Sequence, residues 1–341
     1  MYYGAERFPN QAMFNVRKYL KVLVKTMLEN KGQIYEYTKV LSVKKDGDKY
    51  RVYTDTGYIK AKYVIVATHY PIINIPGFYF LKMYQEKSYI IGIETEQKLF
   101  QGMYINAESP TLSLRTAKDD DKEIVLISGM DHKTGAKIDL SNAYNNLERI
   151  AKELYSDAKV RYRWETQDCI TLDKIPYVGE YSCLMNNVFV ATGYKKWGMT
   201  TSNIAANIIA DKILGKKNSY ENLFKSTRLR PIKNRWEFGA MLKESTNSLV
   251  INKLKIPKES VEDVQKGEGK IVKVNGEKLG IYKDEDGKIY KIKPYCAHLG
   301  CELSWNNLEK TWDCPCHGSR FDYKGHQIYE PAIGDVEIKL E

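Results

Sequence analysis

Four of the six cysteines in this 341-residue chain lie close together near its C-terminus, and two histidines stand among them. They form two groups, Cys296-Ala-His298-Leu-Gly-Cys301 and Cys314-Pro-Cys316-His317-Gly-Ser, with fifteen residues between His298 and Cys314. Thiolate sulfur and imidazole nitrogen are ligands of zinc and of iron–sulfur centres. Cysteines packed in this way in a chain with no export signal favour a metal centre over a disulfide scaffold.

Two metal centres suit this ligand set. A [2Fe–2S] centre with two cysteines on one iron and two histidines on the other needs two loops, each presenting one thiolate and one imidazole. Zinc would also use four such ligands, but it leaves the second, offset cysteine pair and the Cys-His-Gly-Ser sequence unexplained. The glycines permit tight loops that bring backbone N–H groups toward the cluster.

The two groups resemble the paired motifs of Rieske proteins, and Glu330-Pro331-Ala332 stands where that family places a third loop. The resemblance covers about residues 258–341. It implies a [2Fe–2S] cluster and therefore electron transfer. It also implies the site residues: Cys296 and Cys314 on the buried iron, His298 and His317 on the outer iron, and a disulfide between Cys301 and Cys316.

Elements that could position this site follow from the pattern of apolar residues. Short strands and glycine turns after Gly267 predict a small all-β domain. Earlier, the patterns predict helices over 14–30, 141–155 and 201–214, and strands over 33–43, 50–54, 88–94, 111–116, 124–129, 160–165 and 187–191. The continuous apolar run at 63–67 predicts a strand buried on both faces.

Four stretches in the first 220 residues resemble FAD-dependent oxidoreductases of the D-amino-acid oxidase and glycine oxidase type. They are Lys39-Val-Leu-Ser-Val43, Lys62-Tyr-Val-Ile-Val-Ala-Thr68, Thr171-Leu-Asp-Lys-Ile-Pro-Tyr-Val-Gly179 and Asn187-Val-Phe-Val-Ala-Thr-Gly-Tyr-Lys-Lys-Trp-Gly-Met-Thr200. Members of this family pass a hydride from an amine or amino acid to the flavin.

The resemblance implies contacts for each part of FAD. Val40 would meet the adenine, and Ala67 and Thr68 the dinucleotide. The isoalloxazine would lie against residues 193–200, which include Gly193, Trp197, Gly198, Met199 and Thr200. A buried strand that runs through a small-residue loop into a helix suits this role, because backbone N–H groups and a helix N-terminus can approach a polar or anionic edge.

Two features depart from the family. No G-x-G-x-x-G turn for the FAD pyrophosphate occurs, since Gly4 is the one glycine before Gly32. His69 also follows Ala67-Thr68 where the family commonly has glycine. We therefore expect weak or absent FAD in this sequence, which lacks the family's N-terminal dinucleotide-binding segment. The sequence fixes no catalytic residue. The segments that resemble the substrate side contain Tyr104, Arg115, His132, Lys195, Lys196 and Trp197, of which Arg115 could bind a carboxylate.

Charge and hydropathy exclude some classes of protein. The net charge is +10, yet residues 256–341 carry −3, and residues 216–255 carry +7. This basic segment contains no nucleic-acid-binding motif, and we expect no nucleic-acid partner. The apolar stretch 63–80 is broken by His69, Pro71, Asn74 and Pro76, which excludes a membrane span. With no export leader, the expected location is the cytoplasm.

The sequence thus predicts a mixed α+β and α/β fold in three parts. Residues 1–220 form an incomplete FAD-dependent oxidoreductase region, with a mixed sheet and helices plus an antiparallel substrate-side sheet. Residues 221–257 form a basic linker, and residues 258–341 form the Rieske domain. The predicted function is oxidation of a small amine or amino acid through FAD, with electrons passing through the cluster to an unknown acceptor.

Three other functions were considered. A pure electron-transfer module would use the flavin region only as a scaffold. A Rieske oxygenase needs a downstream iron site of two histidines and a carboxylate, but only His326 follows the motifs. A respiratory Rieske subunit needs an N-terminal membrane anchor, which the sequence lacks.

Overall fold

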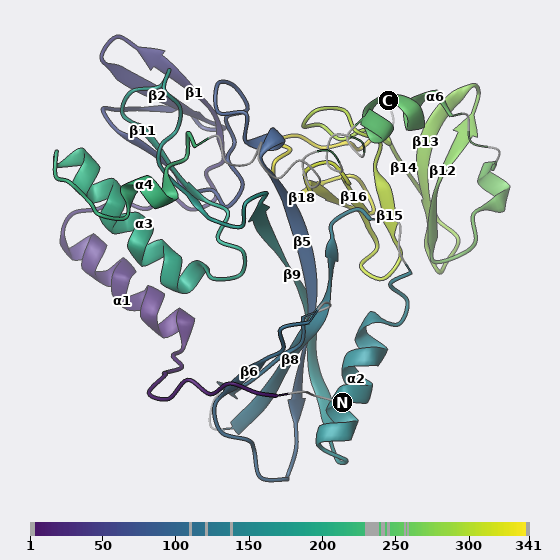
Figure 1. Cartoon of the computed structure of the whole chain (residues 1–341). Coiled ribbons are helices and arrows are strands. Elements are labelled where there is room, and N and C mark those ends of the chain that lie inside the picture. Colours follow the sequence, from purple (N-terminus) through teal and green to yellow (C-terminus); the bar gives the residue numbers. More distant parts are fainter. Residues whose placement is uncertain are drawn as a thin grey trace.

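A computed structural model describes residues 4–338, except for 109–110, 120–121, 137–138, 229–238, 240–242, 244–245, 256 and 258. Figure 1 shows three parts: a mixed region with helices α1 and α3, a long antiparallel sheet below it, and an all-β region at the C-terminal end of the chain. The centre of the predicted linker therefore lies outside the described residues. Within the described ranges, no helix is both long enough and apolar enough to cross a membrane.

A small mixed sheet is the centre of the first part. Its strand order is β10-β11-β4, built from β4 (Val64–Val66), β10 (Tyr177–Glu180) and β11 (Val188–Thr192). Strand β11 is parallel to β4 and antiparallel to β10. Helix α3 (Gly198–Ile213) packs on this sheet through an apolar cluster that includes Phe189, Ala205 and Ile208. The short helix α4 (Glu221–Phe224) follows α3.

A second sheet and the first helix belong to the same part. The sheet is antiparallel, with β1 (Val40–Asp46), β2 (Lys49–Thr54) and β3 (Tyr58–Ala61) in that order. Helix α1 (Val16–Glu29) begins at Asn15, whose side chain accepts a hydrogen bond from the Lys18 amide at 3.1 Å. No residue of α1 is buried. Its apolar side chains, Leu20, Leu23, Val24, Met27 and Leu28, are exposed.

The long sheet has the order β6-β7-β8-β5-β9, and every neighbouring pair is antiparallel. Its strands are β5 (Met83–Glu94), β6 (Met103–Ile105), β7 (Ser113–Asp119), β8 (Lys122–Lys133) and β9 (Lys159–Thr171). Helix α2 (Ala143–Leu154) covers one face through Leu147 and Ala151, which pack with Tyr89, Ile91 and Val125. The 3-10 turn η1 (Tyr79–Leu81) leads into β5.

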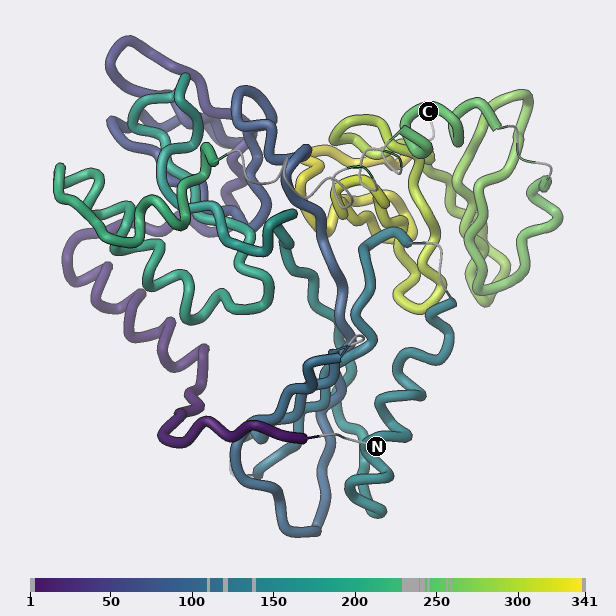
Figure 2. The backbone as a smooth tube through the Cα atoms, in the orientation of Figure 1, coloured from purple at the N-terminus to yellow at the C-terminus, as the bar shows by residue number. Residues whose placement is uncertain are grey.

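The C-terminal part is all-β, as predicted from its glycine turns. One sheet holds β12 (Glu268–Val274), β13 (Glu277–Lys283) and β14 (Ile289–Ile292), and the other holds β15 (Ser304–Asn306), β16 (Thr311–Asp313), β17 (Arg320–Asp322) and β18 (Gln327–Tyr329). Before them come a π-helical turn (Asn247–Ile251), α6 (Asn252–Leu254) and a 3-10 turn (Val261–Asp263). Leu249 packs onto the cysteine-containing core, so this end of the linker is attached to the all-β region. Figure 2 traces the path of the backbone through the three parts.

Two predictions about strands are wrong. The strand expected from residue 33 begins only at Val40, because residues 34–37 form no ladder and Tyr37 has a left-handed φ of 53°. Strand β4 is not buried on both faces, since Ile65 is 50% exposed. Among the described strands, β4 lies at the edge of its sheet, and this position leaves one face of it uncovered.

Candidate cofactor sites

Two loops of closely similar backbone geometry carry the predicted cluster ligands. In the first loop the Gly300 amide donates to the Cys296 carbonyl at 2.9 Å, and in the second the Gly318 amide donates to the Cys314 carbonyl at 2.9 Å. Both glycines have left-handed φ angles, 77° and 81°, which other residues adopt at a cost. Each loop also closes on itself, because the cysteine amide donates at 2.8 Å to the carbonyl five residues ahead, that of Cys301 or Ser319.

The cysteines separate into a bonded pair and a thiol pair. Cys301 and Cys316 form a disulfide that joins the two loops. Cys314 lies near both of them, with the three sulfurs within 4.8 Å of one another, but two of these three are used in the disulfide. Cys296 and Cys314 remain free thiols and are hydrogen-bonded to each other. That bond lowers the pKa of the Cys296 thiol to about 7, and the same bond, together with burial, raises the pKa of the Cys314 thiol.

The two histidines face each other beside this thiol pair. Their ring centroids are 5.0 Å apart and their planes are nearly perpendicular, at 88°. Burial lowers the pKa of His298 to about 4 and that of His317 to about 3, so both rings are neutral at pH 7. Among the residues that the structure describes, neither buried Nδ1 atom has a hydrogen-bond partner.

These atoms fit the [2Fe–2S] group that the sequence predicts. Two unpaired nitrogens in neutral rings and two free thiols are the donor set that such a centre requires, and a buried nitrogen without a partner is otherwise costly. The four side chains would hold the cluster, with the thiols binding as thiolates. When bound, the cluster would accept and release one electron at a time.

The long sheet holds the second loop in place through two glutamines on β5 and β9. Gln85 Nε2 donates to the carbonyls of His317 at 2.9 Å and Glu330 at 3.0 Å. Gln167 Nε2 donates to the Gly318 carbonyl at 2.7 Å and to Gln85 Oε1 at 2.5 Å. Gly318 has no side chain, and a Cβ there would lie 2.7 Å from Gln85. The fit between the sheet and the loop is therefore close.

A buried group of four charged side chains lies next to these glutamines. Lys87 and Arg320 carry positive charge, and Glu165 and Asp313 carry negative charge. Lys87 Nζ lies 3.5 Å from Asp313 and 3.9 Å from Glu165. Arg320 pairs with Asp313 at 3.0 Å and also with Glu165. Burial alone would raise the pKa of the Asp313 carboxyl, but the charges of Arg320 and Lys87 hold it below its usual value. The group joins the two regions and has no net charge.

The predicted FAD residues lie in the first part of the chain, away from the cluster loops, and most of them follow strands of its mixed sheet. Strands β4 and β11 are parallel, so their carboxyl ends meet at one edge, where ligands bind in open α/β sheets. Ala67 and Thr68 follow β4, and the loop from Gly193 follows β11. Val40 begins β1 in a separate sheet. Gly193 is buried and Gly198 and Met199 are half-buried, whereas Ala67, Thr68 and Thr200 are exposed and Trp197 is 60% exposed.

The candidate substrate-side residues divide between two faces of the long sheet. Lys196 Nζ pairs with Asp131 at 2.8 Å, and Asp131 accepts a hydrogen bond from Ser88 at 2.6 Å. His132 points the other way, because neighbouring residues of a strand alternate, and it stacks on Tyr89 in the core under α2.

Arg115 and Tyr104 also lie on opposite faces of the long sheet. Arg115 pairs with Leu126, whereas its neighbour Leu114 belongs to the core under α2, so Arg115 lies on the face away from α2. Its buried Nε atom has no hydrogen-bond partner among the described residues. Tyr104 packs on Phe100, which belongs to the same core.

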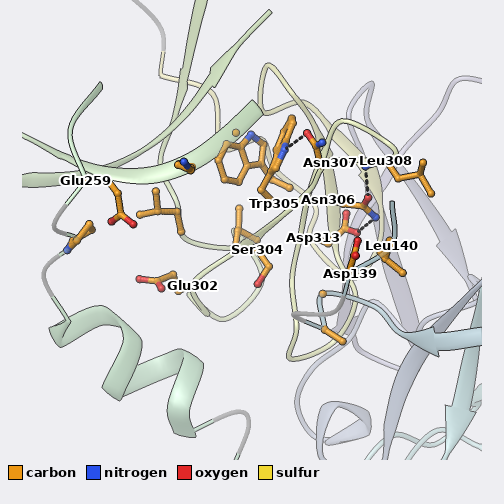
Figure 3. Close-up of a pocket in the computed structure, with 18 of the residues that line it drawn as sticks. Asp139, Leu140, Glu259, Glu302, Ser304, Trp305, Asn306, Asn307, Leu308 and Asp313 are labelled. Atoms are coloured by element: carbon orange, nitrogen blue, oxygen red, sulfur yellow. Dashed lines mark hydrogen bonds between the residues drawn. The ribbon is translucent and has the colours of Figure 1, made fainter. Parts of the chain in front are cut away.

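A hollow of about 1020 Å³ lies between the β8–α2 connection and the all-β region. Figure 3 shows Trp305 and the carboxylates of Glu259 and Glu302 along it, with Asn306 hydrogen-bonded to Asp313 at 3.3 Å. None of the four predicted cluster ligands lines this hollow. Glu302 and Asp313, the neighbours of Cys301 and Cys314, do line it, so the hollow lies beside the cluster loops without including the ligands.

Comparison with known proteins agrees with both predicted regions. The FAD dependent oxidoreductase model matches residues 1–212, and the Rieske [2Fe-2S] domain model matches residues 255–338. This chain belongs to the FAD-dependent oxidoreductase family. Its C-terminal part is a Rieske domain, and the predicted fold class and the two cofactors, FAD and a [2Fe–2S] cluster, are confirmed at the level of these families.

Among curated proteins, this family member is 38% identical over 95% of its length to the putative Rieske 2Fe-2S iron-sulfur protein YhfW of Bacillus subtilis, and it covers 64% of that protein. It therefore spans slightly less than two thirds of this relative. It is also 33% identical over 27% of its length to the cytochrome b6-f complex iron-sulfur subunit of Chlorobaculum tepidum, of which it covers 51%.

Solved structures show the same fold for the first part of this oxidoreductase. Glycine oxidase from Geobacillus kaustophilus superposes with a TM-score of 0.52 at 20% identity, over 61% of this chain and 56% of that one. Glycine oxidase from Bacillus cereus gives a TM-score of 0.51 at 17% identity, over 61% of this chain and 57% of the other.

Sequence reasoning missed the residues that join the two regions, notably Asn74, Gln85 and Gln167. Gln85 is fully buried, yet it lies in an ordinary strand pattern more than 200 positions from its partners in the Rieske domain. The one available signal was the polar Asn74 in an otherwise apolar stretch, which indicates a buried polar contact but does not name the partner.

Proposed function

We propose that this protein oxidises a small amine or amino acid at an FAD site and passes the electrons, one at a time, through its own Rieske cluster to an external acceptor. The family supports the oxidoreductase class and the two cofactors. The glycine oxidases among the structural neighbours support the choice of an amine substrate. Each substrate molecule releases two electrons, so two transfers through the cluster complete one turnover.

One observation carries the proposal: the predicted flavin loop and the cluster loops lie on opposite faces of the same two strands. On β9, Gln167 faces the cluster loop, and Asp168 faces the other way. The flavin loop meets that other face through Lys196, which pairs with Glu86 of β5 and with Asp131. It also contacts the edge of β9, where the Lys195 amide donates to the Cys169 carbonyl at 3.2 Å. The two predicted sites thus have this one sheet layer between them.

Side chains of this chain supply the binding chemistry in the proposal. Arg115 has a buried Nε atom without a partner on the face away from α2, which suits a carboxylate. Lys196 holds its loop against the sheet through Asp131. When bound, FAD would accept the hydride from the substrate.

The test is an anaerobic reduction experiment. The chain, with its cluster assembled and FAD added, is mixed with glycine, D- or L-amino acids, or N-methylated amines. We expect at least one of them to reduce the cluster, as seen by electron paramagnetic resonance. In a Cys314→Ser variant, which lacks a predicted ligand, the substrate should still bleach the flavin, but the resonance signal of the reduced cluster should be absent. Flavin reduction that never reaches the cluster would contradict the proposal.

A second candidate is an electron-transfer module with no substrate of its own. The exposure of Ala67, Thr68 and Trp197 favours it, because a tightly held cofactor is normally well covered. In that case the cluster would be reduced by an external donor at the same rate with or without FAD and amine.

A further inference from the structure

The histidine edge of the cluster site is covered by residues 69–81 of the first part. His298 Nε2 lies 2.6 Å from Asn74 Oδ1. With Nδ1 bound to iron, the neutral ring carries its hydrogen on Nε2, so the imidazole donates and the amide oxygen accepts. Asn74 thereby fixes both the tautomer and the rotation of the His298 ring.

Aromatic rings pack against both histidines at this edge. Tyr70 meets the His298 ring edge-on, with centroids 6.4 Å apart at 76°. Phe80 meets the His317 ring in the same manner, at 5.9 Å and 84°. The backbone of Phe80 also hydrogen-bonds the His317 ring, and His317 is only 3% exposed.

The covering segment is itself anchored to the flavin side. The Tyr79 hydroxyl donates to the Tyr181 carbonyl at 2.8 Å, and the Tyr181 hydroxyl donates to the Ile73 carbonyl. Thr192, the residue before the predicted flavin-contacting Gly193, donates to the His69 carbonyl. A short path of contacts therefore leads from the flavin loop through residues 69–70 to His298.

We propose that residues 69–81 are a built-in partner for the histidine edge, that Asn74 is the positioning residue of His298, and that external electron partners use another face of the Rieske domain. Naming this edge as the entry for electrons rests on the proposed function. The closure of the edge does not, because it follows from contacts between described residues.

Chemical modification tests the closure. Diethyl pyrocarbonate attacks imidazole nitrogens that carry no hydrogen. With Nδ1 on iron only Nε2 remains, and it reacts once it has lost its hydrogen, so the oxidised protein is treated at a pH high enough to remove that hydrogen. In the cluster-loaded protein we expect peptide mass spectrometry to find adducts on the exposed His69 and His326, but not on His298 or His317. Asn74→Ala should expose His298 and raise its modification at least tenfold. Ile75→Ala is the matched control, since Ile75 is 67% exposed, and it should leave the pattern unchanged. Equal modification of His69, His326, His298 and His317 in the unaltered protein would overturn the proposal.

Redox potential tests the positioning role. Asn74→Ala removes the acceptor from the His298 hydrogen, which makes the ring a poorer electron donor to iron and should raise the cluster potential. Asn74→Asp offers a charged acceptor and should lower it. If Asn74 had only a structural role, both substitutions would shift the cluster potential in the same direction, or both variants would lose iron. Identical potentials in all three cluster-loaded proteins would also overturn the assignment.

Neither measurement needs flavin or substrate. If the amine fails to reduce the cluster while His298 stays protected, the proposed function is wrong and the closed edge stands. If the amine reduces the cluster but His298 is freely modified, the proposed function stands and the closed edge is wrong.

Discussion

The two cofactor sites of this protein differ in how completely their surroundings cover them. At the predicted cluster site, the predicted ligands, the hydrogen-bond donors and the covering rings are all buried or half-buried, and they come from both regions of the chain. At the predicted flavin site, Ala67, Thr68 and Trp197 stand exposed, and no residue of the nearby α1 is buried. The difference teaches that local loops present the predicted cluster ligands and the first region covers them, whereas the described residues leave one side of the predicted flavin site open.

The largest expected effect is loss of the cluster. Cys314→Ser should remove iron and acid-labile sulfide together, because a buried serine hydroxyl cannot replace a thiolate on iron. The unaltered protein should contain both, without zinc, and should show a Rieske signal by electron paramagnetic resonance when reduced. Stoichiometric zinc in metal analysis of the unaltered protein would contradict the cluster assignment.

The second prediction concerns the open site. We expect FAD to leave this chain readily during gel filtration, because the described contacts leave one side of the predicted site exposed. Addition of a separate G-x-G-x-x-G segment from a relative should increase retention, since it supplies backbone donors for the pyrophosphate. Stoichiometric flavin retained by the chain alone would remove the contrast between the two sites.

The third prediction concerns the buried charges between the two regions. Arg320→Met leaves Asp313 and Glu165 with Lys87 as the one positive charge of the group, so it should lower the free energy of unfolding by about 3–5 kcal/mol. Lys25→Met is the matched control, since its ion pair with Glu29 is 75% and 61% exposed, and the expected loss is below about 0.5 kcal/mol. Urea denaturation of both variants measures the difference. Similar losses would show that the joint contributes little.

The smallest expected effect is a shift of cluster potential. Ser319 is fully buried and hydrogen-bonded to the side chain of Cys296, and Phe321 is fully buried and has no hydroxyl group to donate. Ser319→Ala should lower the potential and Phe321→Tyr should raise it, each by tens of millivolts, because such donors stabilise the more negative reduced cluster. Voltammetry on iron-replete samples checks both signs. An unaltered protein already near the top of the Rieske range, or an unmoved potential in Ser319→Ala, would contradict this view.

The site could be predicted from the sequence where its parts are local. The predicted ligands lie within 22 positions, in two loops whose glycines and cysteines specify their own turns. The burial of β4 could not be predicted, because an apolar run such as 64–66 does not say whether a neighbouring strand covers it. The side of the sheet on which Asp131 and His132 lie depends on how β8 pairs with β5. That pairing includes a bulge in β5 between Lys87 and Tyr89. The Asn74–His298 contact joins residues 224 positions apart, and no spacing rule reaches that far.

The alternation of contacts along strand β5 limits how well the protein can tolerate an inserted residue there. Its odd positions, Gln85 and Lys87, hold the Rieske domain, while its even positions, Glu86 and Ser88, face Lys196 and Asp131. A single residue inserted before Gln85 would turn every following side chain to the opposite face. The contacts with the Rieske domain and those with Lys196 and Asp131 would then be lost together. This strand should therefore accept substitutions far more readily than changes in length.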